Sequence, residues 1–371
     1  MKRFIARNGR PARNGDGQAA VSAGVALAVS SARAIAVCTA VSSVLLVALT
    51  LCTCSPKQLP ALGPASLLTI VTNVPQNHES VSLIMTLFSK DIGTVDEEKA
   101  YTFEIFPPSK LRKQDDNRNV ILLADLSRND VVAKRATRLL GKKMVGLIMD
   151  GSADYAILRD VSALGQTLAI VAGPSERSLS ELLKARGNRF FSDVDSIIIE
   201  GTKKLTFNMG DQRQMSDYLL SKYGWTIRIP RDFKVAEVEG GGLVKLVGSE
   251  PARLLFVYWK EAERETLDAR YCLLQRAKVA FAYYDEDEID HSRTLTRNVS
   301  FNGRTVVRIE GVWQNEKYVI GGPFFSYCFL DGGRFYIVDC VLFAPGMEKA
   351  SWLKQLDAIA RTFDTRGGET R

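Results

Sequence analysis

The chain has 371 residues, of which 46% are hydrophobic and 25% charged, the balance of a globular protein with a substantial core. Its formal net charge is +7, but the first 33 residues hold six basic residues against one acid and so carry +5 of that excess. The remaining sequence is close to neutral and has no basic tract, which argues against nucleic-acid binding.

Residues 1–54 read as a signal or anchor segment. The basic leader is followed by an apolar run at residues 34–51 and then by Cys52 and Cys54, the order typical of an exported, lipid-anchored protein of the bacterial cell envelope. Cys54 is the predicted lipid anchor, with Cys52 as the alternative. The eighteen-residue run is borderline for a membrane span, so an uncleaved helical anchor and cleavage to a soluble form stay open. We expect a membrane-attached protein whose folded part lies outside the cytoplasm.

Residues 55–66 hold three prolines and are predicted to be a tether. An N-terminal α/β domain is predicted over residues 67–207, and hydrophobic periodicity indicates its elements. Strands are expected at residues 67–73, 101–106, 119–126, 155–161 and 166–172. Helices are expected at residues 79–90, 130–140, 178–185 and 190–205. A capping box formed by Ser178 and Glu181 is predicted to start the third helix.

A C-terminal α/β domain is predicted over residues 216–364. Helices are expected at residues 216–222, 266–281 and 350–363. Strands are expected at residues 225–229, 233–237, 243–247, 254–259, 299–301, 305–314, 324–330 and 334–343. Glycine-rich turns at residues 240–242, 302–303 and 332–333 predict hairpins. The predicted fold class is α+β, with two α/β domains whose sheets are largely antiparallel and carry packed helices.

The folded part contains three cysteines, Cys272, Cys328 and Cys340. An oxidising compartment would permit one disulfide and leave one thiol over. A two-residue turn at residues 332–333 places Cys328 opposite Ile337 and Cys340 on the other sheet face, which disfavours a bridge between these two. Their apolar surroundings predict buried thiols.

Little in the chain indicates catalysis. His78 and His291 are the two histidines, and neither accompanies a nucleophile, metal-binding or phosphate-binding motif. We therefore predict no catalytic residues, no metal and no cofactor, with His78 capping or solvated at a helix start. The acidic run at residues 285–291 is predicted to be a solvated loop, because Ile289 stands where a calcium loop needs a ligand. Carboxylates such as Asp160 and Glu310 leave hydrolase chemistry open.

The segment Gly321-Gly322-Pro323-Phe324 is the strongest candidate for a binding feature. Its two glycines allow positive φ or close backbone approach, and the proline removes a donor at a strand start. The segment therefore either only shapes the start of a strand or, with Trp313, forms a binding edge. Aromatic residues of the second half are predicted either to fill the core or to line a cleft. They are Trp225, Phe256, Trp259, Trp313, Phe324 and Phe325.

Several motifs resemble a bacterial lipoprotein family known as domain of unknown function 4837. They are residues 223–234 (YGWTIRIPRDFK), 310–314 (EGVWQ), 321–327 (GGPFFSY) and 343–359 (FAPGMEKASWLKQLDAI), with 118–123 (RNVILL) and 160–166 (DVSALGQ) in the first half. Ser162 stands where that family has an aromatic residue. The family has no established activity, so the resemblance implies location and architecture. In layout the second half also resembles Mog1/PsbP-type α/β/α sandwich domains.

The sequence thus predicts a non-enzymatic envelope lipoprotein that binds a ligand or an envelope protein partner. Two alternatives stay open: an envelope hydrolase that uses carboxylates, and a structural component of an envelope assembly.

Overall fold

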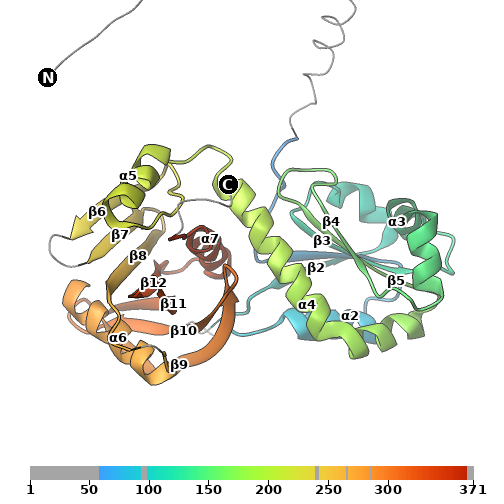
Figure 1. Ribbon diagram of the computed structural model, residues 1–371. Coiled ribbons are helices and arrows are strands. Elements are labelled where there is room, and N and C mark those ends of the chain that lie inside the picture. The colour runs from blue at the N-terminus through green and yellow to red at the C-terminus, as the bar shows by residue number, and fades with distance from the viewer. Residues whose placement is uncertain (1–57, 93–97, 239–241, 265, 285, 366–371) are drawn as a thin grey trace, which may run out of the picture. The chain divides into compact units, whose positions relative to one another are not determined.

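The computed structural model describes residues 58–92, 98–238, 242–264, 266–284 and 286–365. The predicted signal segment, with Cys52 and Cys54, lies outside these residues. Gln58–Arg371 forms one compact unit, which contains two separate β-sheets (Figure 1). None of the helices in the described part combines the length and the apolar character needed to cross a membrane.

The first sheet has five strands in the order β2-β1-β3-β5-β4. Its strands are β1 Leu67–Thr72, β2 Thr102–Phe106, β3 Asn119–Asp125, β4 Ala156–Arg159 and β5 Thr167–Gly173. The first three pairings along this order are parallel, and β4 runs antiparallel to β5. Every residue of β3 and β5 is buried, as expected for central strands covered on both faces.

Helices cover both faces of the first sheet. They are α2 Glu79–Phe88, the 3-10 helix η1 Pro108–Gln114, α3 Val131–Met149 and α4 Glu176–Thr206. Helices α2 and α4 pack on one face through residues such as Val81 and Leu179. On the other face, η1 and α3 contribute Leu111 and Val132. The first half of the chain, from β1 to the end of α4 at Thr206, is therefore a three-layer structure.

Helix α4 is one helix where the sequence predicted two. Gly187 lies between the two predicted segments, and a Cβ there would meet Leu87 Cδ1 of α2 at 2.7 Å. The glycine therefore allows α2 to pack closely against α4 and does not end the helix. The predicted capping box of Ser178 and Glu181 is also wrong, because the box is formed by Ser175 and Ser178. Helix α3 is longer than predicted and continues past a kink at Gly141, whose φ is +71°.

The second sheet has seven strands in the order β6-β7-β8-β12-β11-β10-β9, all antiparallel. They are β6 Phe233–Val238, β7 Leu243–Gly248, β8 Ala252–Glu261, β9 Glu288–Phe301, β10 Arg304–Asn315, β11 Ile320–Asp331 and β12 Arg334–Phe343. Across both sheets, seven of the ten pairings between described strands are antiparallel. The predicted α+β class with largely antiparallel sheets is thus confirmed, while the three parallel pairings of the first sheet were not predicted.

Helices also cover both faces of the second sheet. They are α5 Arg213–Tyr223, α6 Ala269–Tyr283 and α7 Ala350–Ala360. Leu219 of α5 and Leu356 of α7 belong to the core on one face. Cys272 and Val279 of α6 belong to the core on the other. The second half is therefore the predicted α/β/α sandwich.

Two predicted elements of the second half differ in the structure. Residues 225–229 are not a strand, because the segment has one bridge, between Thr226 and Asp364, and otherwise places Trp225, Ile227 and Ile229 in the core. The acidic run at residues 285–291 is not wholly a loop, since its last four residues begin β9.

Strand β9 forms one edge of the second sheet and carries a bulge. Glu310 pairs with Leu295, but Val312, two residues further along β10, pairs with Asp290. The intervening residues of β9 therefore lie outside the regular ladder, and the strand bends there. Leu295 itself is 70% exposed.

Candidate functional site

Segments from the two halves of the described unit line a groove of about 410 Å³. The lining residues are Glu98, Lys99 and Thr102 from the first half, and Gly346, Met347, Glu348 and Lys349 from the second. A volume of this size is within the range of small-molecule sites, roughly 300–1,000 Å³, and such sites occur preferentially between structural units.

Lys349 joins the two sides of the groove. Its Nζ lies 2.6 Å from Oε1 of Glu98, and its backbone N–H donates to Oε2 of the same carboxylate at 2.8 Å. Lys349 is only 7% exposed, so this ion pair is largely shielded from water and from salt. The chain reaches it through the turn at Gly346, whose φ of +68° lies in the left-handed region that glycine adopts without strain.

A second set of polar contacts holds the same two halves together. The hydroxyls of Ser66 and Ser351 lie 2.8 Å apart, and Lys354 Nζ of α7 lies 3.3 Å from Asp195 of α4. The Tyr101 hydroxyl donates to the same aspartate, and Lys354 Nζ is 3.8 Å from the centre of the Tyr101 ring. Burial, and then the charge of Asp195, raise the pKa of Tyr101 well above its ordinary value. The junction beside the groove is thus fixed by directional contacts.

The groove presents charges of both signs beside an apolar side chain. Two lysines and two glutamates line it, and the side chain of Met347 is 45% exposed. Lys99 pairs with Asp91, and Glu348 accepts a hydrogen bond from the Ser351 backbone N–H at 3.1 Å. This arrangement suits a polar ligand that carries both charge signs and has a small apolar part.

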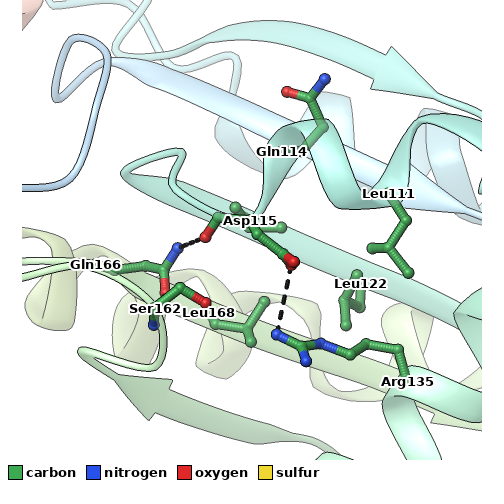
Figure 2. A pocket seen from close by; sticks show the side chains of 9 residues that line it. Leu111, Gln114, Asp115, Leu122, Arg135, Ser162, Gln166 and Leu168 are labelled. Carbon is green, nitrogen blue, oxygen red and sulfur yellow. Dashed lines mark hydrogen bonds and ion pairs between the residues drawn. The ribbon is translucent and has the colours of Figure 1, made fainter.

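A much smaller cavity lies under η1 and α3 in the first half, and Figure 2 shows its lining. Its volume of about 10 Å³ is near the minimum for one water molecule. Arg135 reaches across it to Asp115 at 3.4 Å, and Gln166 Nε2 donates to the Asp115 carbonyl at 2.6 Å. Ser162 also lines this cavity. The cavity is too small for a substrate.

The predicted binding edge is not an exposed loop. Gly321, Gly322, Pro323 and Phe324 belong to β11, and the last three are buried. Trp313 is 4% exposed, and its Nε1 donates to the Leu342 carbonyl at 3.2 Å. These side chains are parts of the core, so we do not retain them as a binding edge.

The glycines of that segment have a packing role. A Cβ on Gly322 would lie 2.2 Å from the carbonyl oxygen of Leu342, and one on Gly321 would lie 2.6 Å from that of Trp313. The structure therefore supports the close backbone approach considered from the sequence. Most of the aromatic set singled out from the sequence is likewise buried in the core.

Asp160 and Glu310 do not converge on a common site. They belong to different halves, and each has separate cationic partners: Asp160 pairs with Lys204, and Glu310 lies 2.9 Å from both Arg297 and Arg308. His78 is the N-cap of α2, as predicted, with Nδ1 accepting from the Ser80 backbone N–H at 3.2 Å. Among the described residues, no group of three or more histidine, cysteine or acidic side chains could hold a metal ion.

Sequence reasoning missed the groove because its two sides are far apart in the chain. Glu98 and Lys349 are separated by 251 residues, and neither carries a motif of its own. The one available signal was the motif at residues 343–359, which contains the whole second side of the groove.

Residues 212–362 match the model of a family described as Domain of unknown function (DUF4837). A comparison with curated proteins found no match. Several solved structures do match, among them a protein of Bacteroides thetaiotaomicron that is 10% identical, with a TM-score of 0.25 and coverage of 38% of this chain and 44% of that chain. The chain therefore spans less than half the length of that relative.

Two further matching structures are a PsbP and a Mog1 protein, the two types that the second half resembles in layout. Cyanobacterial PsbP (CyanoP) from Synechocystis is 15% identical, with a TM-score of 0.28 over 38% of this chain and 86% of that chain. The Ran-binding protein Mog1p from Saccharomyces cerevisiae is 11% identical, with a TM-score of 0.29 over 39% and 93% of the two chains. We base no functional argument on scores this low. The family match spans residues 212–362, which contain the whole second sheet with α5, α6 and α7.

Proposed function

We propose that this protein is a non-enzymatic binding module of the bacterial cell envelope, held at a membrane by its N-terminal segment. The observation that carries the binding role is the groove of about 410 Å³ between the two halves. Its volume is within the range of small-molecule sites.

The ligand class follows from the lining. With two lysines and two glutamates the groove is neutral overall, so a ligand with a single net charge gains little from it. A zwitterion can address both signs at once, and the exposed Met347 side chain offers an adaptable apolar contact. Free amino acids and short peptides are the chemical class that fits.

Filling the groove should abolish this binding. Thr102→Trp places a large side chain at an exposed position that lines the groove, whereas Glu104→Trp places one at an exposed position two residues along the same strand that does not. We expect free amino acids or dipeptides to raise the melting temperature of the wild-type protein, since a ligand at a hundred times its Kd stabilises by about 2.7 kcal/mol. The Glu104→Trp variant should respond like the wild type, and Thr102→Trp should not respond.

The control ligands for this experiment are acetate and methylammonium, which carry one charge each. Scanning fluorimetry gives the melting temperature, and titration calorimetry gives the affinity. The groove would be refuted as the binding site if the melting-temperature shift were unchanged in Thr102→Trp. The same conclusion would follow if no zwitterion shifted the melting temperature of the wild type.

The membrane attachment rests on the sequence of residues 1–54, where a basic leader, an apolar run and then Cys54 follow one another. Acylation of the Cys54 thiol would anchor the folded part outside the cytoplasm. The partners that follow are the membrane and, through the exposed faces of the folded part, another envelope protein.

Replacing Cys54 with alanine is expected to prevent acylation and to leave an unprocessed precursor. Intact mass and membrane fractionation of the variant beside the wild type measure both effects, with Cys52→Ala as the matched control two residues away. Wild-type processing and acyl mass in Cys54→Ala would refute the assignment to Cys54. If Cys52→Ala alone loses the acyl group, the anchor is Cys52.

A further inference from the structure

Helix α6 covers the face of the second sheet that is opposite α5 and α7. Arg276 of this helix forms an ion pair with Asp339 of β12, with Nη2 3.1 Å from Oδ2. Asp339 is the cross-strand partner of Ser326 on β11, and the Ser326 hydroxyl donates to its carboxylate. These contacts fix the position of α6 along the sheet.

The same register brings two cysteines together. Cys272 precedes Arg276 by four residues, so both side chains lie on one face of the helix about 6 Å apart along its axis. Cys328 follows Ser326 by two residues, so both lie on one face of β11 about 7 Å apart. Tyr271, next to Cys272, packs edge-on against Phe335, the cross-strand partner of Leu330, so the N-terminal end of α6 lies toward Leu330. With Arg276 at Ser326 and Asp339, Cys272 therefore lies at Cys328.

The surroundings of the two thiols agree with this geometry. Cys272 and Cys328 are both fully buried and belong to the same apolar cluster. Burial, and then a hydrogen bond with Cys272, raise the pKa of Cys328 well above its ordinary value. The third cysteine, Cys340, is equally buried but faces the opposite core, where its thiol lies 3.8 Å from the Leu356 carbonyl.

We propose that Cys272 and Cys328 form a disulfide when the chain folds in an oxidising compartment. Both thiols are oxidised by exchange with an incoming disulfide, such as that of an oxidised dithiol oxidoreductase or of glutathione. One bond forms between the two cysteine sulfurs, the incoming disulfide bond breaks, and the two thiol protons pass to its released thiolates. Because the folded core excludes reagents from both thiols, the exchange takes place before α6 closes over the sheet.

The bond would tie α6 covalently to β11 and close the loop that contains β9 and β10. Such a cross-link stabilises mainly by restricting the unfolded chain. It also leaves Cys340 as the single free thiol of the three. The proposal is independent of the groove and of the ligand.

The experiment uses the full chain with Cys38, Cys52 and Cys54 replaced by serine, so that the three folded-part cysteines allow only three pairings. The protein is refolded in oxidised and reduced glutathione, quenched with acid, unfolded, alkylated and digested with trypsin. Mass spectrometry is expected to find a linked pair of peptides that contain Cys272 and Cys328, and an alkylated Cys340. Oxidation should raise the melting temperature by roughly 5 °C or more.

The variants test the pairing directly. Cys340→Ala, the matched control at an equally buried position on the other face, should keep the linked peptides and the higher melting temperature. Cys272→Ala and Cys328→Ala should each abolish both. Full alkylation of Cys272 and Cys328 in the folded, oxidised parent protein would overturn the proposal, and so would a link from either of them to Cys340. This readout on the parent holds even if a single variant does not fold.

Discussion

Replacing Asp339 with alanine should lower the free energy of unfolding by about 3 to 5 kcal/mol. The Arg276 side chain is 2% exposed and that of Asp339 is fully buried. Two hydrogen bonds, at 3.3 and 3.1 Å, join the two side chains. Removing the carboxylate would leave a guanidinium buried in the core with no opposite charge, and its desolvation would no longer be offset. Chemical denaturation followed by circular dichroism measures the loss.

The control for this prediction removes both charges together. Arg276→Met combined with Asp339→Leu keeps an apolar core of similar volume, and we expect it to be much more stable than the single variant, because replacing a buried ion pair by packed apolar groups is often neutral. Arg276 also stacks on Phe324, 3.8 Å from the ring centre, and a methionine can retain that contact. A double variant as unstable as Asp339→Ala would contradict the explanation.

Gly322→Ala should cost about 3 kcal/mol, at the upper end of the effects seen for overpacked cores. The added Cβ would lie 2.2 Å from the Leu342 carbonyl oxygen, and that oxygen also accepts the Trp313 indole N–H. Strand β11 is hydrogen-bonded to β10 and to β12, so neither backbone can move away cheaply. Thermal and denaturant unfolding give the cost.

A glycine elsewhere in the chain provides the matched control. Gly146 lies in α3, has no atom within 4 Å of a built Cβ and has no positive φ. Gly146→Ala should therefore stabilise the protein by up to about 1 kcal/mol through helix propensity. If both substitutions destabilised equally, the close approach at Gly322 would not be the reason for its cost.

The sequence predicted the second half well because its strands alternate and its turns have distinctive residues. Asn302 and Gly303 both have positive φ, as do Gly332 and Gly333. The first turn joins β9 to β10, and the second joins β11 to β12 and sets the register that places Cys328 opposite Ile337. The sequence predicts a strand at residues 225–229 because an extended segment that buries every second side chain has the same pattern as a strand. Only the hydrogen-bond ladder to a neighbouring strand distinguishes a strand from an extended segment, and that ladder depends on tertiary contacts.

For the first half, the sequence predicts the positions of the strands and helices better than the direction in which the strands pair. A buried strand such as β3 is apolar on both faces, so its sequence does not indicate whether its neighbours are parallel. The sequence predicts two helices where the structure has α4 alone. Gly187, which has a low helix propensity, lies between them, and Leu87, the neighbour that accounts for this glycine, comes from a distant part of the chain. The groove was beyond sequence reasoning for the same reason, since Glu98 and Lys349 are 251 residues apart in the chain and meet only in the folded structure.

The bulge in β9 bears on the behaviour of the protein at high concentration. A long, flat edge strand is a template on which another chain can add a strand, and this can lead to aggregation. Between Asp290 and Leu295 the backbone leaves the ladder, so a second chain could not pair continuously along all fourteen residues of the strand. We therefore expect the bulge to disfavour the addition of a second strand along this edge.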